Sequence, residues 1–115
     1  MPPKSLFLAA ALAAAPAAAQ FTGPSVQGAE MTVEAARAAR VDSYVTLTGR
    51  IAAHLREDYY LFRDATGEIR VEIEDRVWAG RPVDPETDLR LRTEVDRNAA
   101  GTVYLWVQSL DVLSR

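Results

Sequence analysis

The sequence predicts a mainly β domain, a five-stranded Greek-key barrel with one short α-helix before its first strand. Residues 59–73 read as two alternating strands joined by a tight Asp-Ala-Thr-Gly turn. Aromatic and β-branched residues recur there at every second position, and Gly67 supplies the positive φ that such a turn needs. A longer alternating strand precedes this hairpin, and a polar, proline-bearing connection follows it, which is the order expected in a small Greek-key barrel.

The N-terminus is typical of a secretory signal peptide. Lys4 precedes an apolar run over residues 6–15, and the small residues Ala17 and Ala19 predict cleavage before Gln20. The run is shorter than the roughly 18 residues that a membrane-spanning helix requires. No cysteine follows it to carry a lipid. We therefore expect a soluble periplasmic product with no membrane insertion after processing.

The length and charge of the mature chain limit what it can be. Removing residues 1–19 from 115 leaves 96 residues, enough for one domain. With no cysteine, disulfides and thiolate metal sites are excluded. Only Lys4 among the basic residues leaves with the signal, so 12 basic residues face 16 acidic ones, a net charge of −4. That balance and the predicted export argue against a nucleic-acid partner.

The mature chain begins with an expected flexible lead-in over residues 20–31, which is rich in glycine and polar residues, and the barrel domain is expected over 32–115. A short helix should run from Val33 to about Ala39. Thr32 can cap its first turn, and its alanines and arginines have high helix propensity. We expect this helix to lie against the barrel through Val33 and Ala36.

Alternation assigns the core-facing side of each strand. Gly49, in the middle of the first strand, costs stability there, so we expect it to let a bent strand curl between two sheets. Residues 75–86 break the alternation and predict an inserted helix or elaborated loop, with Trp78 capping the barrel floor. The expected inward residues are Val45, Leu47, Gly49 and Ile51, then Tyr60 and Phe62, then Ile69, Val71 and Ile73, then Leu89, Leu91 and Val95, and finally Val103, Leu105 and Val107.

Several blocks of the chain together resemble the bacterial OB-fold (BOF) family of YgiW/YdeI type. The most specific is Tyr-x-Phe-x-Asp-x-x-Gly at residues 60–67, and the others fall at 32–36, 42–49, 78–80 and 94–96. The resemblance implies an exported, periplasmic, single-domain OB-fold barrel associated with stress tolerance. It also implies binding of a small ligand or envelope partner, and no enzymatic activity. The sequence departs from the family at Thr93, commonly glycine, and at Tyr44, Tyr104 and Trp106, which changes the outer surface.

Catalytic chemistry has little support. His54 is the only histidine and there is no cysteine, so any Ser-His-Asp or Cys-His arrangement would have to use it. It precedes a polar stretch over 56–58, and we expect an exposed loop histidine. One histidine without cysteine also leaves at most a weak carboxylate site for a hard cation. The sequence therefore predicts no enzyme, no cofactor and no dedicated metal site.

A row of charged residues on the third strand allows two interpretations. Glu68, Arg70, Glu72 and Glu74 are spaced two apart and so share one face. The row is either a solvated outer face that discourages edge pairing or a cation-attracting strip that binds a ligand. Asp64, in the turn before Gly67, is expected instead to hydrogen-bond nearby backbone amides.

Four aromatic residues fall on the outward face, interleaved with arginines. They form either a stacking platform for a sugar, cell-wall or protein partner or a surface partly covered by the N-terminal helix. The aromatics are Tyr44, Tyr59, Tyr104 and Trp106, and the arginines are Arg50, Arg63, Arg90 and Arg92. The hypothetical ligand site comprises Glu68, Arg70, Glu72 and Glu74 with Tyr59, Arg63, Tyr104 and Trp106.

Two functions of different class follow. The first is a periplasmic binding module that recognises a small, cationic ligand under envelope or general stress. The second is an interaction protein that docks an envelope protein or cell-wall partner through the outer aromatic surface, without a small ligand. In either case we expect a monomer.

Overall fold

The computed structural model describes residues 28–114, so the predicted signal peptide and most of the predicted lead-in lie outside the described residues. Within this range no helix has both the length and the apolar character needed to cross a bilayer. The elements are β1 (Ala29–Glu30), α1 (Val33–Arg37), β2 (Tyr44–Arg56), β3 (Tyr59–Asp64), β4 (Gly67–Glu72), α2 (Asp75–Trp78), β5 (Asp88–Arg97) and β6 (Val103–Ser114).

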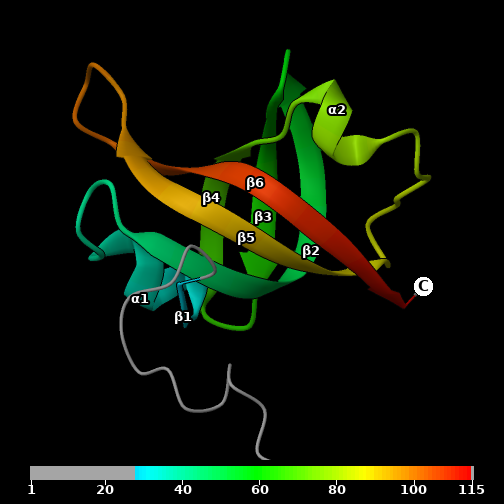
Figure 1. The fold of residues 1–115 in the computed structure, drawn as a ribbon, viewed down its shortest axis with the longest axis horizontal. Coiled ribbons are helices and arrows are strands. Elements are labelled where there is room, and N and C mark those ends of the chain that lie inside the picture. Colours follow the sequence, from blue (N-terminus) through cyan, green and yellow to red (C-terminus); the bar gives the residue numbers. More distant parts are fainter. Residues whose placement is uncertain (1–27, 115) are drawn as a thin grey trace, which may run out of the picture.

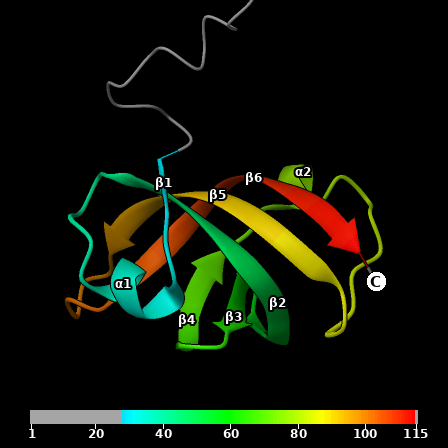
Figure 2. The same cartoon turned by 90° about the horizontal axis from the view of Figure 1, so that it is seen from below.

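The five long strands close into a barrel, which confirms the predicted architecture. They are ordered β2-β3-β4-β6-β5, and β5 also pairs with β2. The β4–β6 pair is parallel, whereas the other neighbouring pairs of long strands are antiparallel. Strands β5 and β6 cross in front of the other three, and the two helices lie at opposite ends of the barrel (Figures 1 and 2). The short β1, expected within the lead-in, runs parallel to the start of β2.

Strand β2 belongs to both sides of the barrel, and Gly49 marks its change of partner. Residues 44–49 pair with β5, and pairing with β3 begins at Arg50 opposite Arg63. A Cβ atom at Gly49 would lie 2.3 Å from the Arg63 carbonyl oxygen and 2.8 Å from the Phe62 ring. Only glycine permits this close crossing, so the predicted role of Gly49 in a bent strand is confirmed.

The predicted core is confirmed with few departures. Phe62, Leu47 and Leu105 are among its largest fully buried side chains. Tyr60 and Val103, expected inward, are only partly buried against it. The core residues are Val33, Ala36, Val45, Leu47, Ile51, Phe62, Ile69, Val71, Ile73, Val77, Leu89, Leu91, Val95, Leu105, Val107 and Leu110.

Two threonines are buried in this β structure. Thr46 alternates with the inward Val45 and Leu47 and should therefore face outward, yet it is only 5% exposed, and it lies opposite Glu30 of β1. Thr93 is fully buried, and its hydroxyl donates to the Val45 carbonyl oxygen at 3.0 Å. A buried hydroxyl needs such a partner because its desolvation is otherwise unfavourable.

Helix α1 begins as predicted and ends two residues early. The Thr32 hydroxyl accepts a hydrogen bond from the Ala35 amide at 3.2 Å, and Val33 and Ala36 are buried. The helix ends at Arg37, because Ala38 leaves the helical region with φ −100° and ψ 3°. The Arg37 guanidinium in turn donates to the Glu68 carbonyl oxygen of β4. The helix is thus fixed to the β3–β4 hairpin.

Helix α2 is the insertion predicted between the third and fourth barrel strands. Trp78 ends it and packs against the core, as predicted for a residue capping the barrel floor. Arg81 donates to three carbonyl oxygens, those of Val77 at 2.8 Å, Trp78 at 3.0 Å and Leu110 at 3.2 Å. These bonds satisfy carbonyls at the helix end and hold α2 against β6.

Candidate ligand-binding face

Strand register brings five outward residues from five strands into one line. Tyr44 pairs with Glu94, Glu94 with Trp106, Trp106 with Glu72, and Glu72 with Tyr59. Side chains of residues paired across a sheet lie on the same face. We call these five residues the aromatic–acidic row. Its composition places an acidic residue on each side of Trp106.

The centre of this row has polar groups without protein partners. Within residues 28–114, neither Glu72 nor Glu94 forms an ion pair or a side-chain hydrogen bond, and the Trp106 indole has none either. All three side chains are partly buried. An unpaired, partly desolvated carboxylate is unfavourable unless a counter-charge approaches it.

The electrostatic surroundings of Glu72 are acidic. Partial burial raises the pKa of its carboxyl group, and the nearby charges of Glu74, Asp58 and Asp96 raise it further. The Arg70 charge acts in the opposite direction but is a smaller influence on that pKa. A cation bound beside Glu72 would therefore offset repulsion already present in the folded chain.

Tyr59 of the row and the nearby Tyr104 both have arginine side chains over their rings. The Arg70 guanidinium lies 4.8 Å from the Tyr59 ring centroid and 5.3 Å from that of Tyr104. The two rings meet edge to face, with centroids 6.1 Å apart. Arg56 lies 5.7 Å from the Tyr59 centroid. Arg70 Nε is buried and has no hydrogen-bond partner among the described residues, so cation–π contacts hold this side chain.

The predicted charged row does not act as one unit. Glu68 accepts a hydrogen bond from Arg63 Nε at 2.8 Å, and Glu74, which lies just before α2 rather than within β4, is 2.9 Å from Arg76 Nε. Glu72 alone among its three acidic members lacks an ion pair within 28–114. No group of three or more His, Asp or Glu side chains in that range is arranged to hold a metal ion.

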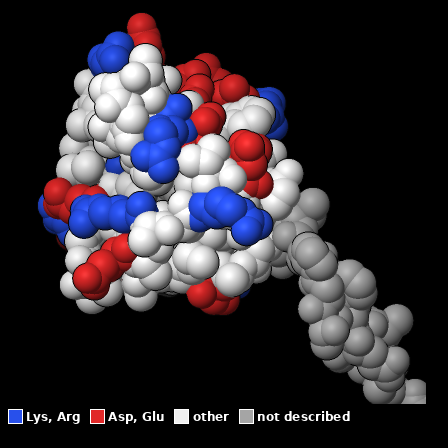
Figure 3. All heavy atoms as spheres, turned by 90° about the vertical axis from the view of Figure 1, so that its left-hand side faces the viewer, with Lys and Arg blue, Asp and Glu red and all other residues white. Residues whose placement is uncertain are grey.

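The arginines predicted to interleave with the aromatics have carboxylate partners instead. Arg50 lies 2.8 Å from Asp88, and Arg92 lies 3.0 Å from Asp111. Figure 3 shows the side of the molecule that faces left in Figure 1. Arginines and carboxylates are mixed there, so neither positive nor negative charge predominates on this side. The remaining two, Arg63 and Arg90, pair with Glu68 and Glu30.

A cleft that we did not predict from the sequence lies at the α2 end of the barrel. His54 is exposed as expected, but it lies in β2 rather than in a loop, because that strand continues to Arg56. Its ring stacks on Tyr60, with centroids 4.6 Å apart, and Tyr60 meets Trp78 edge to face at 5.3 Å. The sequence features that could have indicated it are the inward Tyr60 near the start of β3 and the tryptophan in the connection after β4.

The chain is similar to known bacterial proteins over most of its length. The sequence model of the family described as bacterial OB fold (BOF) protein matches residues 9–112. Protein YgiW of Escherichia coli strain K12 is 38% identical over 89 residues, 68% of each chain. The calcium-regulated OB-fold protein CarO of Pseudomonas aeruginosa is 40% identical over 84 residues, 73% of this chain and 72% of CarO. The solved structure of YgiW from E. coli is 35% identical and matches with a TM-score of 0.71, covering 81% of this chain and 97% of that one.

Proposed function

This chain belongs to the bacterial OB fold (BOF) family, and we propose that it is an exported, periplasmic module that binds a small organic cation on the aromatic–acidic row. The position of Trp106 between Glu72 and Glu94 carries this proposal. The signal-like N-terminus, with small residues before Gln20, supports the periplasmic location. A role in stress tolerance is the physiological context that we propose for this binding.

The chemistry of the row suits an organic ammonium group. A carboxylate accepts strong, charge-assisted hydrogen bonds from an ammonium, and the face of an indole attracts a cation more strongly than any other aromatic side chain. Glu72 and Glu94 would each accept from one amine, while the methylenes between the amines lie over Trp106. A linear polyamine has this alternation of charge and apolar chain.

Tyr59 of the row and Tyr104 next to it show where the ligand does not bind. Because Arg70 occupies positions over both Tyr59 and Tyr104, a ligand cation would have to displace it to use those rings. Trp106 has no such arginine among the described residues. The ligand is therefore placed over Trp106, with Arg70 and the tyrosines as one fixed wall of the site.

A coordinated metal ion fits this row less well than an organic cation. The name of CarO describes that protein as calcium-regulated, so Ca²⁺ is an appropriate competitor. Calcium takes six to eight oxygen ligands, whereas the row offers two carboxylates separated by a tryptophan. We propose that Ca²⁺ is bound more weakly than a polyamine.

Calorimetric titration of spermidine into the purified protein at low salt tests this function. The double variant Glu72→Gln, Glu94→Gln should bind at least tenfold more weakly, and Trp106→Leu should also lose affinity. The matched control is Glu34→Gln, Glu86→Gln, which removes the same charge from exposed positions outside the row. Higher salt should weaken binding, because the Debye length falls from about 10 Å at 0.1 M to about 3 Å at 1 M.

Each outcome of this titration is decisive. Unchanged affinity in the row variant would reject the row as the site and favour the docking of an envelope protein or cell-wall partner. Equal losses in the row variant and the control would show attraction by net charge alone. Tighter binding of Ca²⁺ than of spermidine, abolished in the row variant, would replace the organic cation by a divalent one.

A further inference from the structure

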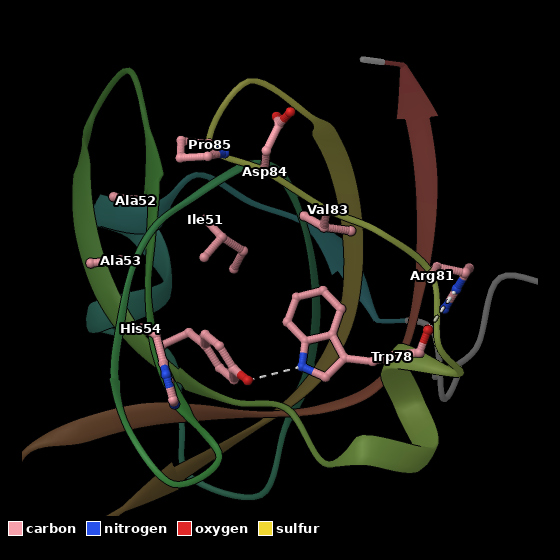
Figure 4. Close-up of a pocket in the computed structure, with 10 residues that line it drawn as sticks. Ile51, Ala52, Ala53, His54, Trp78, Arg81, Val83, Asp84 and Pro85 are labelled. Carbon is pink, nitrogen blue, oxygen red and sulfur yellow. Dashed lines mark hydrogen bonds between the residues drawn. The ribbon is translucent and has the colours of Figure 1, made fainter.

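A cleft at the α2 end of the barrel is separate from the aromatic–acidic row. It lies between residues 51–54 of β2 and residues 81–85 after α2, and its volume is about 380 Å³. Figure 4 shows His54 and Trp78 on one side of it, with Ile51 and Val83 on the side toward Pro85. This volume falls within the range of small-molecule sites, roughly 300–1,000 Å³.

The bend of β2 opens this cleft. After Gly49 the strand leaves β5, and its remaining residues pair only with β3. Strand β5 itself begins at Asp88, so the connection over 81–85 faces the departing half of β2 without a ladder between them. Ile51, Val83 and Pro85 supply apolar surface there. The cleft is therefore a consequence of the backbone, not of side-chain positions alone.

The Tyr60 hydroxyl offers a donor to this cleft. Its oxygen accepts a hydrogen bond from Trp78 Nε1 at 3.2 Å, and its own hydrogen has no acceptor among the described residues. A hydroxyl both donates and accepts. Tyr60 is a lining residue of the cleft, so a ligand atom that accepts a hydrogen bond would satisfy it.

The His54 ring offers the complementary acceptor. Its Nε2 lies 2.7 Å from the Glu57 carbonyl oxygen, and a carbonyl only accepts, so Nε2 carries the hydrogen. In the neutral ring, the other nitrogen, Nδ1, is then an acceptor. The Glu57 contact thus selects the tautomer, and stacking on Tyr60 fixes the ring plane.

The aromatic wall is held in place before any ligand arrives. Arg81 donates to the carbonyl oxygens of Val77 and Trp78, which anchors the end of α2 and so the indole. Since these donors are used internally, the Arg81 guanidinium is a brace and not a ligand-binding group. An adjacent hollow beyond Pro85 is less suitable, because both of its lining arginines are already paired, Arg50 with Glu86 and Asp88, and Arg63 with Glu68.

We propose that this cleft binds a small, neutral aromatic compound with one hydroxyl or N–H group, with its ring packed against Trp78. The ligand hydroxyl donates to His54 Nδ1 and accepts from Tyr60. We propose an aromatic ligand because Tyr60 and Trp78, which pack edge to face, line the cleft. A further aromatic ring can pack against Trp78 in an offset or edge-to-face arrangement, which aromatic rings prefer. A phenol is the simplest compound of this class.

Phenol is the probe, with cyclohexanol and toluene as matched compounds that lack the aromatic ring and the hydroxyl, respectively. The chain has two tryptophans, so its spectrum of indole N–H groups contains two signals, and Trp106→Phe assigns them. Phenol should shift the Trp78 signal, with a dissociation constant on the order of 1 mM. Toluene and cyclohexanol should each bind at least tenfold more weakly.

Two variants test the contacts. Tyr60→Phe should weaken phenol binding about tenfold, as loss of one hydrogen bond does. Because that change also removes the partner of Trp78, Ala53→Leu, at an exposed lining position, should block the cleft without removing any hydrogen bond. Trp106→Phe should leave phenol binding unchanged.

The experiment separates this site from the row. Spermidine should shift only the Trp106 signal, and phenol only that of Trp78, so either site can fail alone. The proposal is overturned if phenol leaves the Trp78 signal unmoved, or if Ala53→Leu binds phenol as tightly as the wild type. Equal affinities for phenol and toluene would overturn the assigned hydrogen bonds.

Discussion

Asp64 accepts a hydrogen bond from the backbone amide of Val33, with 2.8 Å between Oδ2 and N, although the two residues are 31 positions apart. Its other oxygen accepts from the Thr66 amide at 2.7 Å, and Thr66 Oγ1 accepts from the Glu34 amide at 3.0 Å. The first amides of a helix lack partners within the helix. The Asp-Ala-Thr-Gly turn therefore caps α1. The prediction that Asp64 bonds nearby amides is confirmed, and a distant amide is added.

Removing the Asp64 charge should destabilise the protein and change its acid sensitivity. Partial burial would raise the pKa of Asp64, but hydrogen bonds from Thr66, Val33 and Gly67 outweigh burial and lower it. A lowered folded-state pKa stabilises the protein above the unfolded value of about 3.9, and this contribution is lost as pH falls through the folded-state pKa. Asp64→Asn should cost about 1 kcal/mol at pH 7.

Urea denaturation over a series of pH values measures both effects. Below about pH 4, the free energy of unfolding of Asp64→Asn should fall less steeply than that of the wild type. Asp75→Asn is the control. Asp75 lies in the first turn of α2, but its carboxylate accepts no hydrogen bond from the described residues. Identical pH profiles for Asp64→Asn and wild type would contradict the capping role.

The phase of β3 can be tested at two adjacent residues. Phe62 is fully buried, whereas the Arg63 side chain is 59% exposed. Phe62→Ala should cost about 3–5 kcal/mol, and Arg63→Ala under about 1 kcal/mol. Chemical denaturation measures both. A larger cost at Arg63 would contradict the inward assignment of Phe62.

Gly49→Ala should destabilise the barrel through crowding. The added methyl group would meet the Arg63 carbonyl oxygen, which belongs to backbone and cannot rotate away. We expect a loss of about 1–3 kcal/mol or more. Gly101→Ala is an informative comparison, because its φ of +87° is strained for alanine but its surroundings are open, and its cost should be about 1–2 kcal/mol. A neutral Gly49→Ala variant in thermal unfolding would exclude the close crossing.

Tyr104 should titrate later than a free tyrosine. Partial burial, followed by the charge of Asp96 and the hydrogen bond to it, raises the pKa of Tyr104 to about 12; the hydroxyl donates to Asp96 Oδ2 at 3.2 Å. The neutral form is favoured in the folded state, so this stabilisation is full below about pH 10 and is lost as pH rises toward 12. Phenolate absorbance should show a late transition for Tyr104, assigned by its absence in Tyr104→Phe.

Asp96→Asn provides the test of cause. It should lower the pKa of Tyr104, because it removes both the charge and the strongest acceptor of the hydroxyl. Asp111→Asn, which alters a carboxylate paired with Arg92 instead, should leave the late transition in place. A late transition that stays unchanged in Asp96→Asn would exclude Asp96 as a cause of the raised pKa of Tyr104.

Export should remove the first nineteen residues. Ala17 and Ala19 are the small residues that signal cleavage prefers, so intact-mass measurement of periplasmic protein should show a chain that begins at Gln20. A periplasmic product that retains Met1, or protein confined to the cytoplasm, would contradict the proposed location.

Alternation was sufficient to predict the barrel interior, because a side chain's face depends only on its own strand. It correctly placed Leu47, Phe62 and Leu105 in the core. It misplaced Thr46 as exposed, because a strand's own pattern does not show what covers its outer face. It also placed His54 in a loop, because the extra residues that let β2 continue past Ile51 involve register shifts that no local pattern encodes.

The candidate face was predictable only in part for the same reason. Glu72, Tyr59 and Trp106 were assigned to the outside correctly, but Glu94 was not recognised as a neighbour of Trp106. That contact depends on the register of β5 against β6, which shifts between Arg92 and Thr93. The face on which a side chain lies follows from the alternation of its own strand, whereas its neighbours depend on how two strands pair.

The bend of β2 at Gly49 has a further consequence for how the chain acquires its fold. The β2–β3 and β3–β4 hairpins join segments that are close in sequence. Residues 44–49, in contrast, pair with residues 89–94, about 45 positions further along the chain. Until β5 is available, that half of β2 has an unpaired edge, which is the kind of segment that associates with other chains. Proteins dominated by such distant pairings fold in milliseconds to seconds, slowly for their size. We therefore expect closure of the barrel to be the slow step of folding, with the first half of β2 left without its β5 partner until closure occurs.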